Sequence, residues 1–212
     1  MRILVFGAAG RTGRQVVEQA LSHGNEVTAF IRATQLSTEH PALEVVRGDV
    51  LDFESVRVAV AGHDAVISTL GTGVGGGHGE PEKTLSAGIA NVIHAMTLEG
   101  VPRLCAESAA GTFARRDKRL SFRFRAMIAT TLKAVYDELE EMELRIMASD
   151  LEWTIIRPVG LTDGPLTGVY RISLEGDVLP DATAISRADV AALMLKAVSG
   201  DTYLRRAVTI GY

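Results

Sequence analysis

The feature that most constrains the fold is a glycine-rich turn close to the start of the chain. Four apolar residues, Ile3 to Phe6, run directly into Gly7-Ala8-Ala9-Gly10-Arg11-Thr12-Gly13. A short continuous apolar run is typical of a strand buried on both faces of a parallel sheet, and glycine permits the tight turn that follows it. Residues 11–23 then suit a helix, so the chain opens with a strand, a turn and a helix.

The same alternation continues along the chain. Further apolar runs occupy residues 27–31, 43–46, 65–70, 104–106 and 153–156, and helices are expected at 53–61, 81–99, 124–148 and 187–199. Strands and helices in alternation predict a mostly parallel sheet with helices on both faces. With 212 residues and no linker, we expect one doubly wound α/β domain covering residues 1–212.

The longest expected helix, 124–148, carries an apolar stripe with alternating spacings of four and three residues. Its members are Ile128, Leu132, Val135, Leu139, Met142 and Ile146. Such a stripe indicates burial against the sheet, and a helix-pairing dimer seam is the alternative. The sequence leaves the choice between monomer and dimer open.

Composition excludes several functional classes. A formal charge of −4 and a pI near 5.8 provide no overall attraction to nucleic acid or to an anionic membrane. No apolar run is long enough to cross a bilayer, and the N-terminal run is too short for a signal peptide. With a single cysteine, Cys105, an internal disulfide is impossible. We therefore expect a cytoplasmic protein without a metal site, a nucleic-acid partner or a membrane anchor.

The setting of the glycine turn predicts a dinucleotide site and hence a Rossmann fold, with a purely structural turn as the alternative. A G-x-x-G-x-x-G pattern between a strand and a helix lets backbone N–H groups approach a pyrophosphate, with the positive end of the helix beside it. The third glycine permits close helix–strand packing. The expected cofactor-binding residues here are Gly7, Ala9, Gly10, Arg11, Thr12 and Gly13.

The end of the second predicted strand indicates which dinucleotide binds. An NAD site usually has an acid there for the ribose 2′-hydroxyl, but no acid lies between Val27 and Ser37, and Arg32 follows the strand. A guanidinium matches a 2′-phosphate in geometry and charge, so we expect NADP(H), with Arg11 on the other side of the same phosphate.

Two further segments are predicted at the carboxyl edge of the sheet, where open α/β folds bind their ligands. Asp49 and Val50 follow the third strand, and Leu70 and Gly71 follow the fourth. Asp49 could accept from the adenine amino group, or alternatively be the N-cap of the next helix. The glycine-rich segment 71–79 is expected to form a mobile loop over the site.

Together these motifs resemble the atypical branch of the short-chain dehydrogenase/reductase superfamily, and within it the biliverdin-IXβ reductase or flavin reductase family. The resemblance covers nearly the whole chain. It is carried by residues 6–13, by Arg32, by the segments 48–50, 70–72, 108–109 and 164–170, and by 185–191, where Ser186 is expected to cap a helix with Asp189 in its first turn.

The resemblance implies a reductase that transfers a hydride from NADPH to a planar conjugated acceptor. FMN or FAD would be a substrate rather than a bound prosthetic group, and a tetrapyrrole or quinone is a further possibility. Ser108 occupies the superfamily's active-site serine position and Pro158 is expected beside the nicotinamide. The alternative for Ser108 is a serine that only caps a turn at the end of a strand.

The acceptor is inferred from two absences. None of the four tyrosines has a lysine four residues later, which argues against carbonyl reduction by a Tyr-Lys pair. Leu139 and Gly160 stand where biliverdin-reducing relatives have histidines, so flavin is favoured over tetrapyrrole. Two other functions remain open: NADP(H) sensing without catalysis, with the basic segment 115–125 as a partner face, and an epimerase or quinone reductase activity.

Overall fold

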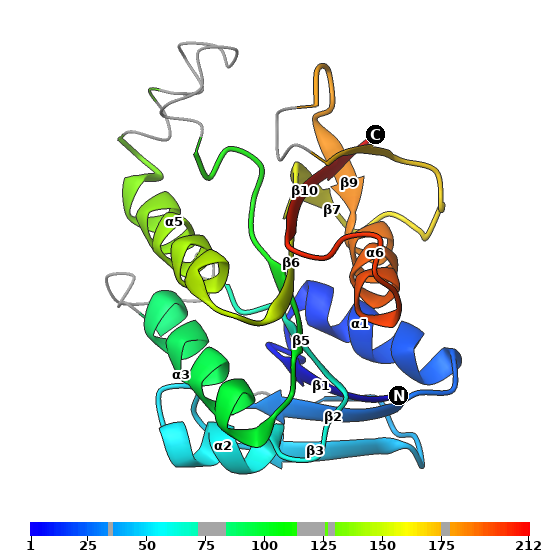
Figure 1. The fold of residues 1–212 in the computed structure, drawn as a ribbon. Helices are drawn as coiled ribbons and strands as arrows, with labels where there is room; N and C mark the ends of the chain where they lie inside the picture. The colour runs from blue at the N-terminus through cyan, green and yellow to red at the C-terminus, as the bar shows by residue number, and fades with distance from the viewer. Residues whose placement is uncertain (34–35, 72–83, 114–125, 127–129, 175–178) are drawn as a thin grey trace.

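The computed structural model describes residues 1–33, 36–71, 84–113, 126, 130–174 and 179–212. Its centre is a sheet with the strand order β3-β2-β1-β4-β5-β6-β10-β8 (Figure 1). The strands are β1 Arg2–Phe6, β2 Glu26–Ile31, β3 Leu43–Arg47, β4 Ala65–Ser68, β5 Arg103–Glu107, β6 Glu152–Pro158, β8 Arg171–Ser173 and β10 Arg206–Gly211. Neighbouring strands are parallel, apart from the antiparallel β10–β8 pair. A separate parallel pair is formed by β7 Gly160–Thr162 and β9 Ala184–Ser186.

The strand order reverses at the first strand. The chain leaves β1 toward β2 and β3 on one side, and then returns to place β4 on the other side of β1. Phe6 at the end of β1 is in register with Phe30 of β2 and with Ser68 of β4. Such a switch point is where doubly wound folds bind their ligands.

Helices cover both faces of the sheet (Figure 1). On one side lie α1 Arg11–Ser22 and α6 Arg187–Ser199, and on the other α2 Phe53–Val60, α3 Thr84–Glu99 and α5 Lys133–Ala148. Each side encloses its own buried apolar cluster. This arrangement confirms the predicted doubly wound α/β fold. Within the described ranges, none of the helices combines the length and apolar character needed to cross a bilayer.

Several element boundaries differ from the prediction. The segment 43–46 was expected to be buried on both faces, but β3 is an edge strand and Val45 is 45% exposed. Residues 130–132 form turns and α5 begins at Lys133, so the expected start at residue 124 is wrong for this described part. Residues 81–83, 124–125 and 127–129 lie outside the described residues. The short strands β7 to β10 were not predicted.

The apolar stripe of α5 is used inside the chain. Leu139, Met142 and Ile146 are buried in the apolar cluster on the α5 side of the sheet, and Leu132 and Val135 pack partly against it. Ile128 lies outside the described residues. Burial against the sheet is therefore confirmed for Leu139, Met142 and Ile146.

Ile146 and Leu144 provide a matched test of this packing. Ile146 is fully buried, whereas Leu144, two residues earlier on α5, is 48% exposed. Ile146→Ala should lower the free energy of unfolding by about 2–5 kcal/mol because it leaves a cavity, and Leu144→Ala by less than about 1 kcal/mol. Urea unfolding measures both values, and equal losses would contradict this orientation of α5.

Candidate functional site

The glycine turn is packed too closely for side chains. Gly7 has a φ of +75°, and a Cβ atom added there would lie 2.5 Å from the carbonyl oxygen of Thr69. A Cβ atom on Gly13 would lie 2.2 Å from the carbonyl oxygen of Gly7. Gly10 precedes α1 as its N-cap, and no side chain caps the helix. No side chain therefore competes for the backbone N–H groups at the start of α1, as a pyrophosphate site requires.

Thr69 fastens this turn to the end of β4. Its backbone N–H donates to the carbonyl oxygen of Phe6 at 2.9 Å, and its hydroxyl contacts the carbonyl oxygens of Phe6 and Gly7 at 3.1 and 3.2 Å. The turn is thus held between β1, β4 and α1. Leu70 and Gly71 were predicted as cofactor residues from the sequence, whereas this role of Thr69 was not.

Charged side chains surround the start of α1. Arg11 forms an exposed ion pair with Asp163, and Nη1 of Arg187 donates to the same carboxylate at 2.7 Å. Nε of Arg14 donates to the carbonyl oxygen of Ala9 at 3.1 Å. Asp163 thereby links the first residues of α1 and α6. Arg11, which we expected beside a 2′-phosphate, is paired with this aspartate.

A buried acid lies against the first turn of α1. Glu107 ends β5, and its Oε1 accepts a hydrogen bond of 3.0 Å from the hydroxyl of Thr12. Burial raises the pKa of Glu107 to about 7, opposed by the Thr12 hydrogen bond and by the positive charge of Arg187. The candidate cofactor loop is therefore in contact with a carboxyl group that titrates near neutrality.

Ser108, the next residue, faces the opposite side of the sheet. Its backbone N–H donates to the carbonyl oxygen of Ile156, and Ala110 donates to that of Pro158, both at 2.8 Å. The structure thus brings Ser108 and Pro158 together at the ends of β5 and β6. The Ser108 hydroxyl donates to Oε1 of Glu143 at 2.5 Å and lies 3.1 Å from the hydroxyl of Thr112.

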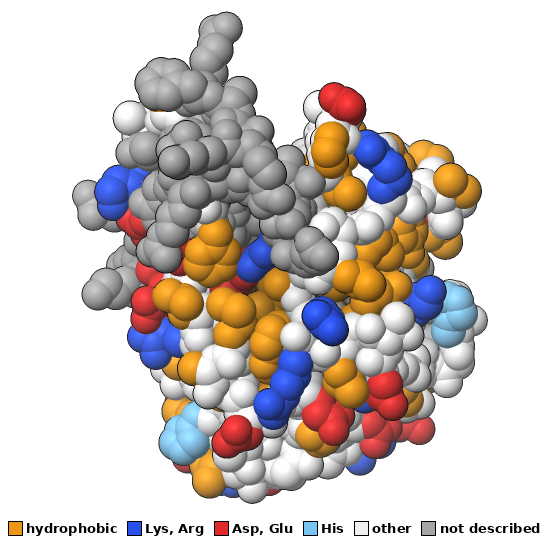
Figure 2. All heavy atoms as spheres, turned by 45° about the horizontal axis from the view of Figure 1, so that its top comes forward, with side chains coloured by type: hydrophobic (Ala, Val, Ile, Leu, Met, Phe, Trp, Pro, Cys, Tyr) orange, Lys and Arg blue, Asp and Glu red, His pale blue; other side chains and the backbone are white. Residues whose placement is uncertain are grey.

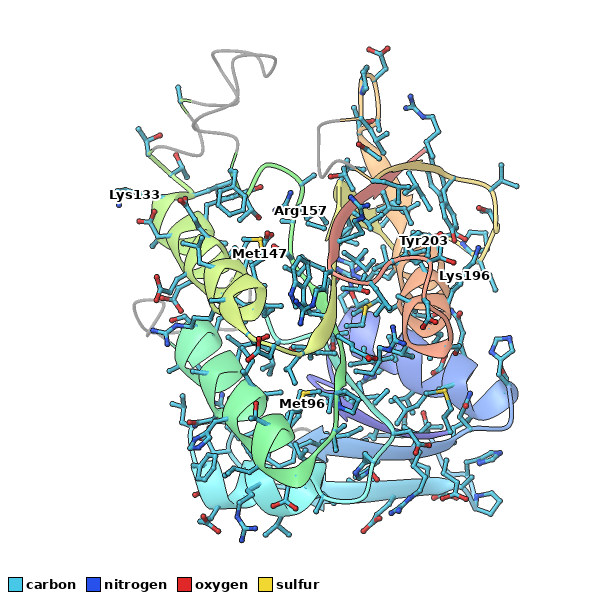
Figure 3. The ribbon with its side chains drawn as sticks, in the orientation of Figure 1. Met96, Lys133, Met147, Arg157, Lys196 and Tyr203 are labelled. Atoms are coloured by element: carbon cyan, nitrogen blue, oxygen red, sulfur yellow. The ribbon has the colours of Figure 1, made fainter. Side chains whose placement is uncertain are left out.

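Glu143 and Arg157 form a buried ion pair behind Ser108. Glu143 projects from α5 and is fully buried, and Nε of Arg157 lies 3.0 and 3.1 Å from its two carboxylate oxygens. Figure 3 shows Arg157 reaching from β6 into the space beside α5, where its guanidinium also lies over the ring of Phe113 at 5.1 Å. The hydroxyl proton of Ser108 points to Glu143. A ligand at Ser108 would therefore meet a hydrogen-bond acceptor rather than a donor.

The expected residues beyond β2 and β3 differ in exposure. Arg32 is exposed directly after β2 and forms no ion pair with any described residue. Asp49 accepts from the backbone N–H of Leu51 at 3.0 Å. The N-cap of α2 is Asp52, which accepts from the backbone N–H of Glu54, so the interpretation of Asp49 as this cap is wrong.

The other predicted cofactor residues, Val50, Leu70 and Gly71, follow the ends of β3 and β4. Val50 is only 8% exposed and packs against Gly88 of α3, while Leu70 packs partly against the same apolar cluster. Gly71 is exposed, and among the described residues no atom lies within 4 Å of the position a Cβ atom would take there. The rest of the predicted loop 71–79 and the whole basic segment 115–125 lie outside the described residues.

The segment 164–170 is held by a buried acid. Ser186 is the N-cap of α6, as predicted, and accepts from the backbone N–H of Asp189 at 3.0 Å. The Asp189 carboxylate in turn accepts from the backbone N–H groups of Thr167 and Gly168 at 3.0 and 2.8 Å, and from the phenol of Tyr212 at 2.7 Å. Asp189 was expected only as a favourable first-turn charge.

Three charged residues of the site were missed, although the sequence carries a signal for each. Glu107 directly follows the apolar run of β5, Glu143 lies on the buried face of α5 among Met142 and Ile146, and Arg157 ends the apolar run of β6. A charged residue inside an apolar pattern is rarely buried unless it is paired. That rule marks such positions without identifying their partners.

The chain has a Rossmann fold with a glycine turn at its switch point, packed too closely for side chains at Gly7 and Gly13. The model of the NAD(P)H-binding family matches residues 7–201, so the chain belongs to that family. This confirms the resemblance to atypical short-chain dehydrogenases/reductases that the motifs indicated.

Individual relatives extend the comparison. The chain is 31% identical over 176 residues to an uncharacterised chloroplastic protein of Arabidopsis thaliana, covering 79% of this chain but only 61% of that protein. It is 29% identical to an uncharacterised sugar epimerase, YhfK, of Bacillus subtilis, covering 90% of this chain and 85% of the epimerase. Among solved structures, ChuY, an anaerobillin reductase from Escherichia coli O157:H7, has a TM-score of 0.77 and 25% identity, covering 99% and 96% of the two chains.

Replacing Glu107 should change how stability depends on pH. A carboxyl with a folded pKa of about 7, above its ordinary value of 4.5, favours folding fully below about pH 4.5 and progressively less up to about pH 7. Glu107→Gln cannot ionise, so it does not lose stability in this pH range, and its amide oxygen still accepts from Thr12. Its free energy of unfolding relative to the wild type should therefore rise by about 2–3 kcal/mol between about pH 5 and pH 8. Parallel pH profiles in urea unfolding would contradict the raised pKa.

Proposed function

We propose that this protein is an NADPH-dependent reductase that passes a hydride to a planar conjugated acceptor. The observation that carries the proposal is the closely packed glycine turn at the switch point, in a chain that belongs to the NAD(P)H-binding family. NADPH, when bound, supplies the hydride. The protein supplies binding, orientation and electrostatics.

The residues present fit such a cofactor. The backbone N–H groups in the first turn of α1 would bind the pyrophosphate, and any side chain at Gly7 or Gly13 would collide with the loop. Arg32, exposed and without an ion-pair partner among the described residues, would hold the 2′-phosphate. Asp49 would accept from the adenine, with Ala9, Val50, Leu70 and Gly71 around the crevice.

The positions of the tyrosines favour a conjugated acceptor over a simple carbonyl. Tyr136 donates to the carbonyl oxygen of Ala110 at 3.2 Å, Tyr203 is buried in a core, and Tyr212 is bound to Asp189. One turn before Glu143 on α5 stands Leu139, which is buried. None of the four tyrosines of the sequence has a lysine four residues later. Reduction of a flavin needs no such pair, because the remaining proton can come from solvent.

Two observations favour different acceptors. The likeness to ChuY, a reductase of anaerobillin, supports a tetrapyrrole. Leu139 and Gly160 support FMN or FAD, since neither position offers an acid to protonate a tetrapyrrole. A Cβ atom on Gly160 would lie 2.6 Å from the carbonyl oxygen of Thr183, so a side chain cannot be accommodated there in this structure. We place flavin first, with tetrapyrrole and quinone as further acceptors.

A second candidate function is sugar epimerisation. The similarity to the Bacillus subtilis sugar epimerase extends over 90% of this chain, which favours a small substrate in the same crevice. NADP(H) sensing without catalysis is the third candidate. Both use the proposed dinucleotide site and differ from the reductase in turnover with a planar acceptor.

Turnover assays distinguish these candidates. Purified protein mixed anaerobically with NADPH and FMN, FAD, biliverdin or a quinone should consume NADPH with at least one of them. Gly13→Ala should abolish this turnover because the added methyl group collides with Gly7, whereas Gly200→Ala, where the nearest atom lies 3.9 Å away, should not. NADPH binding without consumption in any assay would contradict the reductase and favour the sensor or epimerase.

Arg32→Ala should weaken NADPH binding by about ten- to a hundredfold and leave NADH binding nearly unchanged, because one charge-assisted interaction with the 2′-phosphate is lost. Fluorescence titration with both cofactors measures the ratio of dissociation constants. Arg145→Ala, at a half-exposed position on α5, controls for the change in net charge. The role of Arg32 is wrong if the ratio is the same in all three proteins.

A further inference from the structure

Glu107 is a buried acid whose role the proposed reaction does not explain. Its carboxyl accepts one hydrogen bond, from the hydroxyl of Thr12, and the side chain lies on the face of the sheet covered by α1 and α6. Thr12 is 6% and Glu107 9% exposed, so neither group is well solvated. A neutral hydroxyl donor compensates a buried carboxylate less than an ion pair does.

Positive charges near Glu107 are engaged by other partners. On α1, Arg11 pairs with Asp163 and Arg14 donates to a backbone carbonyl. On α6, Arg187 acts on Glu107 through its charge, but its guanidinium is bound to Asp163 at 2.7 Å. Among the described residues, Glu107 therefore has no ion-pair partner of its own.

The remaining titratable groups nearby do not compensate Glu107 either. Asp189 on α6 is a second acid, satisfied by Thr167 and Gly168. Burial raises the pKa of the Cys105 thiol on β5, so it stays neutral. On the other face of the sheet, Glu143 and Arg157 neutralise each other.

From this arrangement we propose that Glu107 takes up a proton when the dinucleotide binds, so that affinity for the cofactor falls as pH rises through neutrality. The inference rests on the proposed function, because it places the cofactor phosphates at the turn that contains Thr12. Phosphate charges beside this turn disfavour a second negative charge at Glu107. The proton comes from solvent, and no bond other than that to the proton changes.

The coupling is reciprocal. If the bound cofactor favours protonated Glu107, then protonated Glu107 must favour the cofactor by the same factor. The free protein titrates at this group near neutrality, so ordinary changes in pH would alter its charge. The site would then bind the dinucleotide more tightly in acid than in base.

Calorimetry on the unmodified protein tests the proton uptake directly. NADP⁺ is titrated in two buffers of different ionisation enthalpy at about pH 7.5, where a phosphate with a second pKa of about 6 is already fully ionised. A rise of one unit in the pKa of Glu107 corresponds to an uptake of about half a proton per cofactor bound. Measurable binding with the same heat in both buffers would overturn the inference.

A variant assigns the uptake to Glu107. The dissociation constant of NADPH is compared for the wild type, Glu107→Gln and Glu44→Gln, the last an exposed acid on β3, at about pH 6 and pH 8.5. Titration of the cofactor itself cancels in the ratio between proteins. The wild type and Glu44→Gln should lose about three- to tenfold more affinity at the higher pH than Glu107→Gln.

The outcomes separate the two proposals. Equal pH dependence in all three proteins overturns the inference and leaves the proposed function standing. If none of the proteins binds NADPH at either pH, the proposed function is wrong and the inference with it. If Glu107→Gln fails to fold, as judged by its thermal transition, calorimetry on the wild type still tests the proton uptake. Binding without uptake would then overturn the inference.

Discussion

Close packing at the glycine turn is the constraint on which the rest of the site depends. Gly13 of α1 approaches the carbonyl oxygen of Gly7 so closely that a single methyl group would not fit, and Gly7 is pressed in the same way against Thr69. This contact sets the start of α1 at the point where β1 and β4 diverge. Thr12 is consequently brought within hydrogen-bond distance of Glu107, and Arg11 within reach of Asp163.

At the end of β5, two neighbouring side chains lie on the two faces of the sheet. Glu107 faces α1 and α6 and accepts from a hydroxyl, whereas Ser108 faces α5 and donates to a carboxylate that Arg157 neutralises. The adjacent residues Glu107 and Ser108 thus point to opposite faces of the sheet. Glu107 is the buried glutamate on one face, and Ser108 contacts the buried Glu143 on the other. We infer that the first face governs cofactor binding and the second orients Ser108 toward the acceptor.

The predictable part of the structure followed from local rules. The runs that became β1, β2, β4, β5 and β6 are apolar and end in polar or turn residues, and the glycine spacing located α1. Strands β7 to β9 have three residues each, too few to show a periodicity. Strand β10 pairs with β6, which lies far before it in the sequence, and that pairing cannot be read from the local pattern. The start of α5 and the cap of α2 at Asp52 were missed because several residues at each place suit either role.

By itself, the sequence determined the α/β class, the position of the glycine turn and the residues available at the carboxyl edge, because hydrophobic period and glycine tolerance are local properties. Only the tertiary structure decided which partners the buried acids meet. Glu107 meets Thr12 across 95 positions of sequence, and Ser108 meets Glu143 across 35. Burial raises the pKa of Glu107. The residues that folding brings to the two glutamates, Thr12 for Glu107 and Ser108 and Arg157 for Glu143, are not their neighbours in the chain.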